Sequence, residues 1–176
     1  MDAGVQDLQG KTERVRPAEL LLLLEEFYRD RATLWRGHVA SARSVEQYDV
    51  NNTYQYVIAR EAEHLGWVRD AAADLGGTDA GDEPVVAPSE DEHPSAGGAS
   101  PAADARRLDG FVETWGPRVA SLAHARHRTM LQLILGETAE HARLFRQAGA
   151  GQQDLLGRRT GGERTGGRVL PTRWVE

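Results

Sequence analysis

The chain contains no cysteine. This absence excludes disulfides, iron–sulfur clusters, zinc held by cysteine and thiolate nucleophiles. Any metal ion that the protein binds must therefore be held by histidine and carboxylate side chains.

Long apolar segments are also missing. The longest uninterrupted apolar run, from Leu20 to Leu24, is bounded by Glu19 and Glu25, whereas a membrane span needs roughly 20 apolar residues. The first sixteen residues lack the apolar core and the small-residue cleavage pattern of a secretory signal. We therefore expect a cytoplasmic protein that does not enter a membrane.

An excess of positive charge is lacking as well. The 21 Lys and Arg residues are outnumbered by 27 Asp and Glu residues, which leaves a formal net charge of −6. Nucleic-acid affinity comes mainly from clustered Lys and Arg, so no nucleic-acid partner is expected. The segment from Arg158 to Arg173 is rich in Arg and Gly. We interpret it as a solvated tail, with contact to an anion as the alternative.

A length of 176 residues fits one domain. Residues 1–16 are polar and unpatterned, residues 17–151 form the predicted bundle domain, and residues 152–176 form a flexible Arg/Gly-rich tail. Inside the domain, residues 76–103 are rich in Gly, Pro, Ser, Ala and acidic side chains without apolar periodicity. Such a composition indicates a flexible acidic linker.

Four helices are predicted around this linker. Proline at a helix opening predicts a first helix over 17–43. A capping-box pattern, Ser44-Val-Glu-Gln47, predicts that a second begins near 45, and Gly76 and Gly77 close it. A short helix over 104–115 is expected to end at Gly116-Pro117, because proline disrupts helices. The last is predicted over 117–148.

Three long helices and one short helix, with almost no β-pattern, predict an all-α up-down bundle. Large aromatic residues at helical spacing usually fill the core of such a bundle. We therefore expect Trp35, Trp67 and Trp115 to pack inside it. The Leu20 to Leu24 run is apolar all around its helix, which indicates either a central helix or one covered in part by another subunit.

The second predicted helix carries two ionisable residues on its apolar face. That face consists, at three- and four-residue spacing, of Tyr54, Val57, Ile58, Glu61, His64, Leu65 and Val68. Burying a carboxylate and an imidazole costs several kcal/mol unless each is paired or binds a cation. A carboxylate and an imidazole one helical turn apart can reach the same metal ion. Glu61 and His64 are thus candidate metal ligands.

A similar pair lies on the last predicted helix, where Glu137 precedes His141 by four residues beside an apolar stripe. The first helix adds a carboxylate by geometry. A hairpin that turns near Ser44 places Glu26 at the height of Glu61, with Glu25 one step away, and the choice between the two stays open.

Two further polar residues lie on the apolar stripe of the first helix. Arg31 and His38 are expected to be buried polar partners, with His38 as a weaker metal candidate.

The Glu61-Ala-Glu-His64 motif, preceded by a helix bearing Glu and followed by a Glu/His helix, resembles the ferritin-like superfamily and its rubrerythrin-type members. The resemblance covers about 17–75 and 117–148. It implies four helices around two iron or manganese ions, and an oxidoreductase acting on Fe(II), peroxide or O₂ as a ferroxidase or peroxidase. The implied metal ligands are Glu25 or Glu26, Glu61, His64, Glu137 and His141.

Two departures from this family pattern bear on activity. Thr138 stands at the position of the family's last-helix glutamate, and Glu113 on the predicted short helix lies beside the turn, far from His141. Three alternatives stay open: an incomplete ligand set, a bundle completed by a second chain as a homodimer, or a lost metal site. The absence of cysteine also excludes a rubredoxin-type extension.

A second function from a different class remains open. The Glu/His pairs at three- and four-residue spacing also fit the surfaces of ordinary helices. The chain would then be a metal-free helical interaction module that dimerises or binds a protein partner. Acid–base catalysis without metal is the least supported alternative, because no nucleophile pattern accompanies the histidines.

Overall fold

The computed structural model describes residues 17–77 and 100–156. The predictions for 1–16, for most of the linker and for the tail from residue 157 fall outside these residues. The described residues form four helices and no strand, so the all-α prediction is confirmed. The helices are α1 (Pro17–Arg43), α2 (Tyr48–Ala73), α3 (Pro101–Ala120) and α4 (Ala125–Gly149).

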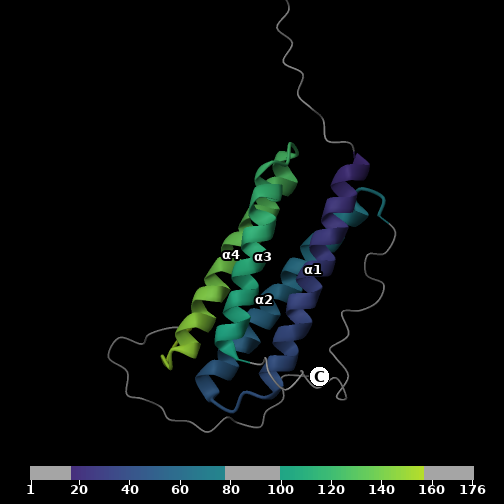
Figure 1. The fold of residues 1–176 in the computed structure, drawn as a ribbon. Coiled ribbons are helices and arrows are strands. Elements are labelled where there is room, and N and C mark those ends of the chain that lie inside the picture. The colour runs from purple at the N-terminus through teal and green to yellow at the C-terminus, as the bar shows by residue number, and fades with distance from the viewer. Residues whose placement is uncertain (1–16, 78–99, 157–176) are drawn as a thin grey trace, which may run out of the picture.

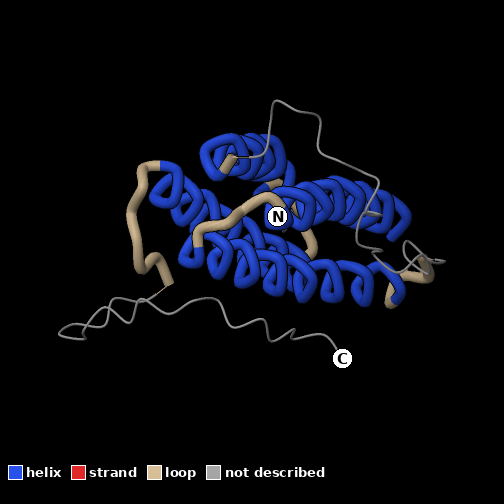
Figure 2. Tube along the Cα trace, turned by 90° about the horizontal axis from the view of Figure 1, so that it is seen from below, coloured by secondary structure: helices blue, strands red, loops and turns tan. Residues whose placement is uncertain are grey.

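The four helices form two antiparallel hairpins, α1 with α2 and α3 with α4, packed side by side (Figure 1). Colour along the chain in Figure 1 shows that α1 and α4 run in one direction and that α2 and α3 run in the other. Besides its hairpin partner, α1 contacts α3 and α2 contacts α4. The pairs α1/α4 and α2/α3 are therefore the diagonals of the bundle, which Figure 2 shows from below.

The first helix has the predicted bounds, but the predicted capping box does not open the second. Ser44 donates its hydroxyl to the carbonyl of Ser41, at the end of α1. The residue that precedes α2 is Gln47, whose side chain makes no capping hydrogen bond. The Ser44 hydroxyl thus caps the C-terminal turn of α1, and α2 begins three residues later than predicted.

The prediction of a break at Gly116-Pro117 was wrong. Helix α3 passes through Pro117 and ends at Ala120. Proline clashes mainly with the Cβ and the backbone N–H of the residue before it. Because Gly116 has no Cβ, part of that clash is absent, and the missing proline N–H lies in the last turn of the helix.

Helix α3 also begins earlier than predicted. The hydroxyl of Ser100 accepts a hydrogen bond from the backbone N–H of Ala103 at 3.2 Å, and Pro101 opens the helix. The expected short helix is therefore a 20-residue helix. The turn to α4 lies between Ala120 and Ala125, several residues after the predicted one.

Apolar side chains fill both ends of the bundle. One cluster contains Phe27, whose ring meets the ring of Trp115 edge to face with centroids 4.8 Å apart. The other contains Phe145. Trp115 is fully buried, Trp35 is nearly so and Trp67 packs against the first cluster, so the predicted packing role of the tryptophans is confirmed.

The leucine run of α1 is only partly buried. Leu20 and Leu24 face the core, whereas Leu22 is 64% exposed. Within residues 17–77 and 100–156, none of the helices combines the length and apolar character that crossing a membrane requires.

Candidate functional site: a polar core

A group of ionisable and hydroxyl side chains lies in the interior beside the apolar clusters, and all four helices contribute to it. Each of these side chains is almost completely buried. We call the group the polar core: Arg31, His38, Tyr54, Glu61, His64, Asp104, Thr138 and His141. The predicted burial of Arg31 and His38 on α1 is thus confirmed.

Arg31 lies at the centre of the polar core and makes polar contacts with side chains of two other helices. Its Nη1 donates to the hydroxyl of Thr138 at 2.7 Å, and its Nη2 donates to Nδ1 of His64 at 2.9 Å. The same Nη2 lies 3.6 Å from Oε1 of Glu61. Burial lowers the pKa of Arg31, and the negative charges of Glu61 and Glu137 oppose that shift. The guanidinium is therefore a buried cation with its own counter-ion.

His64 has a defined tautomer because arginine can only donate hydrogen bonds. Nδ1 accepts from Arg31, so the proton of the neutral ring is on Nε2, which donates to Oε2 of Glu137 at 3.0 Å. Burial and the neighbouring Arg31 lower the pKa of His64 to about 4. Both nitrogens of the neutral ring are thus occupied, and no lone pair is available for a metal ion.

Glu137 closes this side of the polar core toward the solvent. Its carboxylate accepts two-pronged hydrogen bonds from Arg60, with distances of 2.8–3.0 Å, in addition to the one from His64. Burial opposes ionisation of Glu137, but the bonds from Arg60 and His64 outweigh it and lower its pKa. Glu137 is a partly exposed bridge between α2 and α4.

Glu61 is paired on its other side with His38, whose Nδ1 lies 2.7 Å from Oε2 of the carboxylate. Burial opposes the charge on Glu61, but His38 and Arg31 together hold its pKa below the ordinary value. The cost of burying the Glu61 carboxylate is therefore offset by two partners on α1, His38 and Arg31.

Beyond His38, the polar core continues to α3. Nε2 of His38 lies 3.8 Å from Oδ1 of Asp104, and the hydroxyl of Tyr54 donates to Oδ2 of the same carboxylate at 2.5 Å. Arg107 pairs with Asp104 from the surface. Burial and the bond to Asp104 raise the pKa of Tyr54 well above its ordinary value, so this residue stays a protonated donor.

His141 completes the interior on α4. Its ring stacks on that of His64 with centroids 6.3 Å apart, and Tyr56 meets it edge to face. Burial lowers the pKa of His141 to about 4. Four buried atoms of the polar core have no hydrogen-bond partner among the described residues, namely Nε of Arg31, Nε2 of His38, Oε1 of Glu61 and Nδ1 of His141.

The structure brings four of the six predicted ligands together. Glu61, His64, Glu137 and His141 lie in or beside the polar core, whereas Glu26 lies elsewhere. Glu26 pairs with Arg118 at the surface. Glu25 is not part of the polar core either.

The expected height of Glu26 was wrong because the turn between α1 and α2 is centred after Ser44. With that turn, the residues on α1 that lie beside Glu61 are Arg31 and His38. A carboxylate predicted at this level is thus replaced by a guanidinium.

Sequence reasoning missed Asp104 as a member of the site. The predicted turn at Gly116 placed no acidic residue of the third helix near His141. The turn in fact lies between Ala120 and Ala125. Asp104 is in the first turn of α3, and its side chain is fully buried. A buried Asp in the first turn of a helix opened by Ser100 and Pro101 was the pattern that could have identified it.

The arrangement does not fit the implied pair of metal ions. Among residues 17–77 and 100–156, no three His, Asp or Glu side chains are grouped so that they could hold a metal. Arg31 lies between Glu61 and His64, and Thr138 contributes a hydroxyl that is bonded to Arg31. The chemistry of this centre is therefore that of a charge-compensated hydrogen-bond network.

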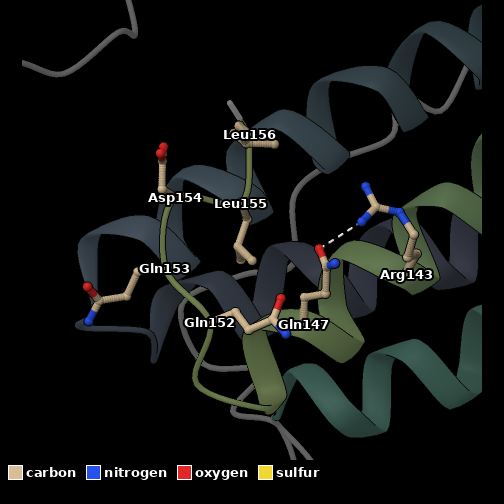
Figure 3. A pocket seen from close by; sticks show the side chains of 7 residues that line it. All are labelled: Arg143, Gln147, Gln152, Gln153, Asp154, Leu155 and Leu156. Atoms are coloured by element: carbon tan, nitrogen blue, oxygen red, sulfur yellow. Dashed lines mark hydrogen bonds between the residues drawn. The ribbon is translucent and has the colours of Figure 1, made fainter. Parts of the chain in front are cut away.

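A cavity of about 300 Å³ lies away from the polar core, beside the C-terminal end of α4 (Figure 3). Its polar lining includes Arg143, which is bonded to Glu140 and to the amide of Gln147. The complete lining is Arg143, Gln147, Gln152, Gln153, Asp154, Leu155 and Leu156. None of the predicted site residues lines it.

Comparison with known proteins returned no counterpart: no family model, no curated protein and no solved structure matches the chain. The site must therefore be interpreted from its own geometry.

Proposed function

We propose that this protein is a ferritin-like bundle with a metal-free centre, and that it acts as a helical interaction module. The observation that carries the proposal is the position of Arg31, whose guanidinium occupies the interior between Glu61 and His64. A guanidinium already supplies the positive charge that a buried carboxylate needs.

The ferritin-like part is supported by helix direction. Two hairpins joined so that α2 and α3 run parallel, with a long connection from Ala73 to Pro101, have the order that the superfamily resemblance implies. Ionisable side chains from every helix at the bundle centre support it as well.

The competing proposal is an iron or manganese oxidoreductase with Glu25 or Glu26, Glu61, His64, Glu137 and His141 as ligands. It has less support for two reasons. Glu26 is engaged by Arg118 at the surface, and neutral His64 has no nitrogen lone pair left for a metal ion.

An interaction module acts through its surface, and one face offers exposed apolar groups. Tyr56 and Leu133 are 44% and 52% exposed. Tyr56 lies one turn before Arg60 on α2, and Leu133 lies one turn before Glu137 on α4. Because Arg60 and Glu137 are paired, the two apolar residues flank one ion pair, and we call this surface the α2/α4 face. The proposed partner at this face is a second copy of the chain or another protein.

Elemental analysis tests the metal-free part. The protein is expressed with iron and manganese supplied and measured beside a Glu61→Ala/His64→Ala double variant. We expect less than about 0.1 metal ion per chain in both. Roughly two ions per chain in the wild type, lost in the variant, would establish the oxidoreductase in place of our proposal.

Light scattering after size exclusion tests the interaction part. We expect the mass of the wild-type protein to rise with concentration toward that of a dimer, and a Tyr56→Ser/Leu133→Ser variant to remain monomeric. Leu22→Ser, which alters an exposed leucine on α1, serves as the control and should behave like the wild type. A wild type that stays monomeric at every concentration and binds no protein partner contradicts the proposal.

A further inference from the structure

Around the end of the Arg31 side chain, the structure gathers groups that ordinarily bind cations. Nη2 lies between two of them, Nδ1 of His64 at 2.9 Å and Oε1 of Glu61 at 3.6 Å. Oε1 of Glu61 and the nearby Nδ1 of His141 are buried and have no hydrogen-bond partner among the described residues. Carboxylate oxygen and imidazole nitrogen are suitable ligands for divalent iron, cobalt, manganese and zinc.

The charges around this point are those that a bound cation would balance. Glu61 is fully buried and needs a positive neighbour. Glu137 supplies a second negative charge at the edge of the same interior. Arg60 pairs with Glu137, so Arg31 is the arginine that compensates Glu61, and its bond to Thr138 holds the guanidinium in place.

We infer that Arg31 takes the place of a metal ion in this bundle and closes the site to divalent cations. This inference rests on the proposed metal-free function. Removing the guanidinium leaves Glu61 buried without its counter-ion and frees Nδ1 of His64. A divalent cation can then be bound by Oε1 of Glu61 and Nδ1 of His64, the two atoms that face the guanidinium.

The test uses two neutral replacements of Arg31 and cobalt(II) as the probe. Arg31→Met preserves much of the volume, and Arg31→Gln also keeps a donor for Thr138 or His64. Each is titrated with Co²⁺ while visible absorption is recorded, and bound cobalt is counted after dialysis. Thermal unfolding is measured with and without the ion. Arg118→Met, which removes a surface arginine paired with Glu26, is the matched control.

We expect both Arg31 variants to bind about one Co²⁺ per chain at least tenfold more tightly than the wild type. At a hundredfold excess of Co²⁺ over its dissociation constant, the unfolding temperature should rise by at least about 5 °C. Arg31→Met/Glu61→Gln should fold without the ion and lose this response, because the carboxylate ligand is gone. The Arg118→Met control should respond as the wild type does.

The outcomes separate this inference from the proposed function. Two variants that gain no cobalt affinity over a metal-free wild type overturn the inference alone. Stoichiometric metal in the wild type overturns the proposed function. If Arg31→Met does not fold by itself, refolding it with Co²⁺ present supports the inference, and failure to refold alongside an unresponsive Arg31→Gln overturns it.

Discussion

Arg31 and Thr138, 107 positions apart in the chain, meet across a diagonal of the bundle, where Nη1 of the arginine donates to the threonine hydroxyl at 2.7 Å. Across the other diagonal, the hydroxyl of Tyr54 on α2 donates to the carboxylate of Asp104 on α3. Apolar contacts tolerate sliding of one hairpin along the other, whereas buried hydrogen bonds require one register. The two diagonal bonds therefore help to define how the hairpins pair.

Glu61→Gln should destabilise the protein by about 3–5 kcal/mol, because it leaves Arg31 as a buried cation without its counter-ion. Urea unfolding followed by circular dichroism measures the loss. Glu26→Gln, in which a surface carboxylate paired with Arg118 is altered, should cost far less. Equal losses in the two variants would contradict the assigned role of Glu61.

Acidification should weaken the fold between pH 6.5 and about 4. His64 and His141 have pKa values lowered to about 4, whereas an unfolded histidine titrates near 6.5. The unfolded chain therefore binds protons that the folded chain does not, and falling pH favours unfolding. Each histidine contributes somewhat less than about 1.4 kcal/mol per pH unit in this window.

Unfolding free energies measured in urea from pH 7 to pH 4.5 test this dependence. The carboxylates Glu61 and Glu137 have lowered pKa values, so their stabilisation is lost only as the pH falls below about 4.5. A His141→Asn variant should show a shallower slope than the wild type, by about one proton. An unchanged slope would mean that His141 is protonated in the folded protein.

Two leucines on α1 should lose very different amounts of stability on the same substitution. Leu24 is fully buried, so Leu24→Ala should cost about 2–5 kcal/mol through lost burial and the cavity that remains. Leu22→Ala, at a position that is 64% exposed, should change the stability by less than about 0.5 kcal/mol. A large loss at Leu22 in a concentration-dependent unfolding experiment would instead show that a partner covers it.

The helix caps can be tested with a pair of serines. Ser100→Ala should cost about 1 kcal/mol, because the hydroxyl accepts the N–H of Ala103 at the start of α3. Ser44→Ala should cost less, since Ser44 does not cap the start of α2. Thermal unfolding monitored by circular dichroism measures both. If Ser44→Ala proved the more damaging, α2 would begin at the capping box after all.

The sequence identified the interior from the periodicity of particular residues. Glu61 and His64 share an apolar face of α2, and the structure buries both. The same periodicity placed Arg31 and His38 inward on α1. Periodicity succeeded for these residues because the inward direction of a side chain depends only on its own helix.

Partners across helices depend on where each turn lies, and there the prediction was less accurate. A local rule for proline placed the second turn at Gly116, and the absence of a Cβ at that glycine weakened the rule. Because the predicted turn came several residues too early, Asp104 was not predicted to lie at the level of the site. The first turn was placed slightly too early, at Ser44, so Glu26 was predicted beside Glu61 where the structure has Arg31. The pattern within a single helix does not determine which residues of two helices lie at the same height, because that register is set by contacts between the helices.

The parallel course of α2 and α3 separates the end of the first hairpin from the start of the second. Ala73 and Pro101 lie near opposite ends of the bundle, so the segment between them acts as a tether that raises the local concentration of one hairpin for the other. In these terms the protein is a heterodimer of two hairpins carried on one chain. A cut within the tether should leave two fragments that reassemble through the bonds of Arg31 with Thr138 and of Tyr54 with Asp104.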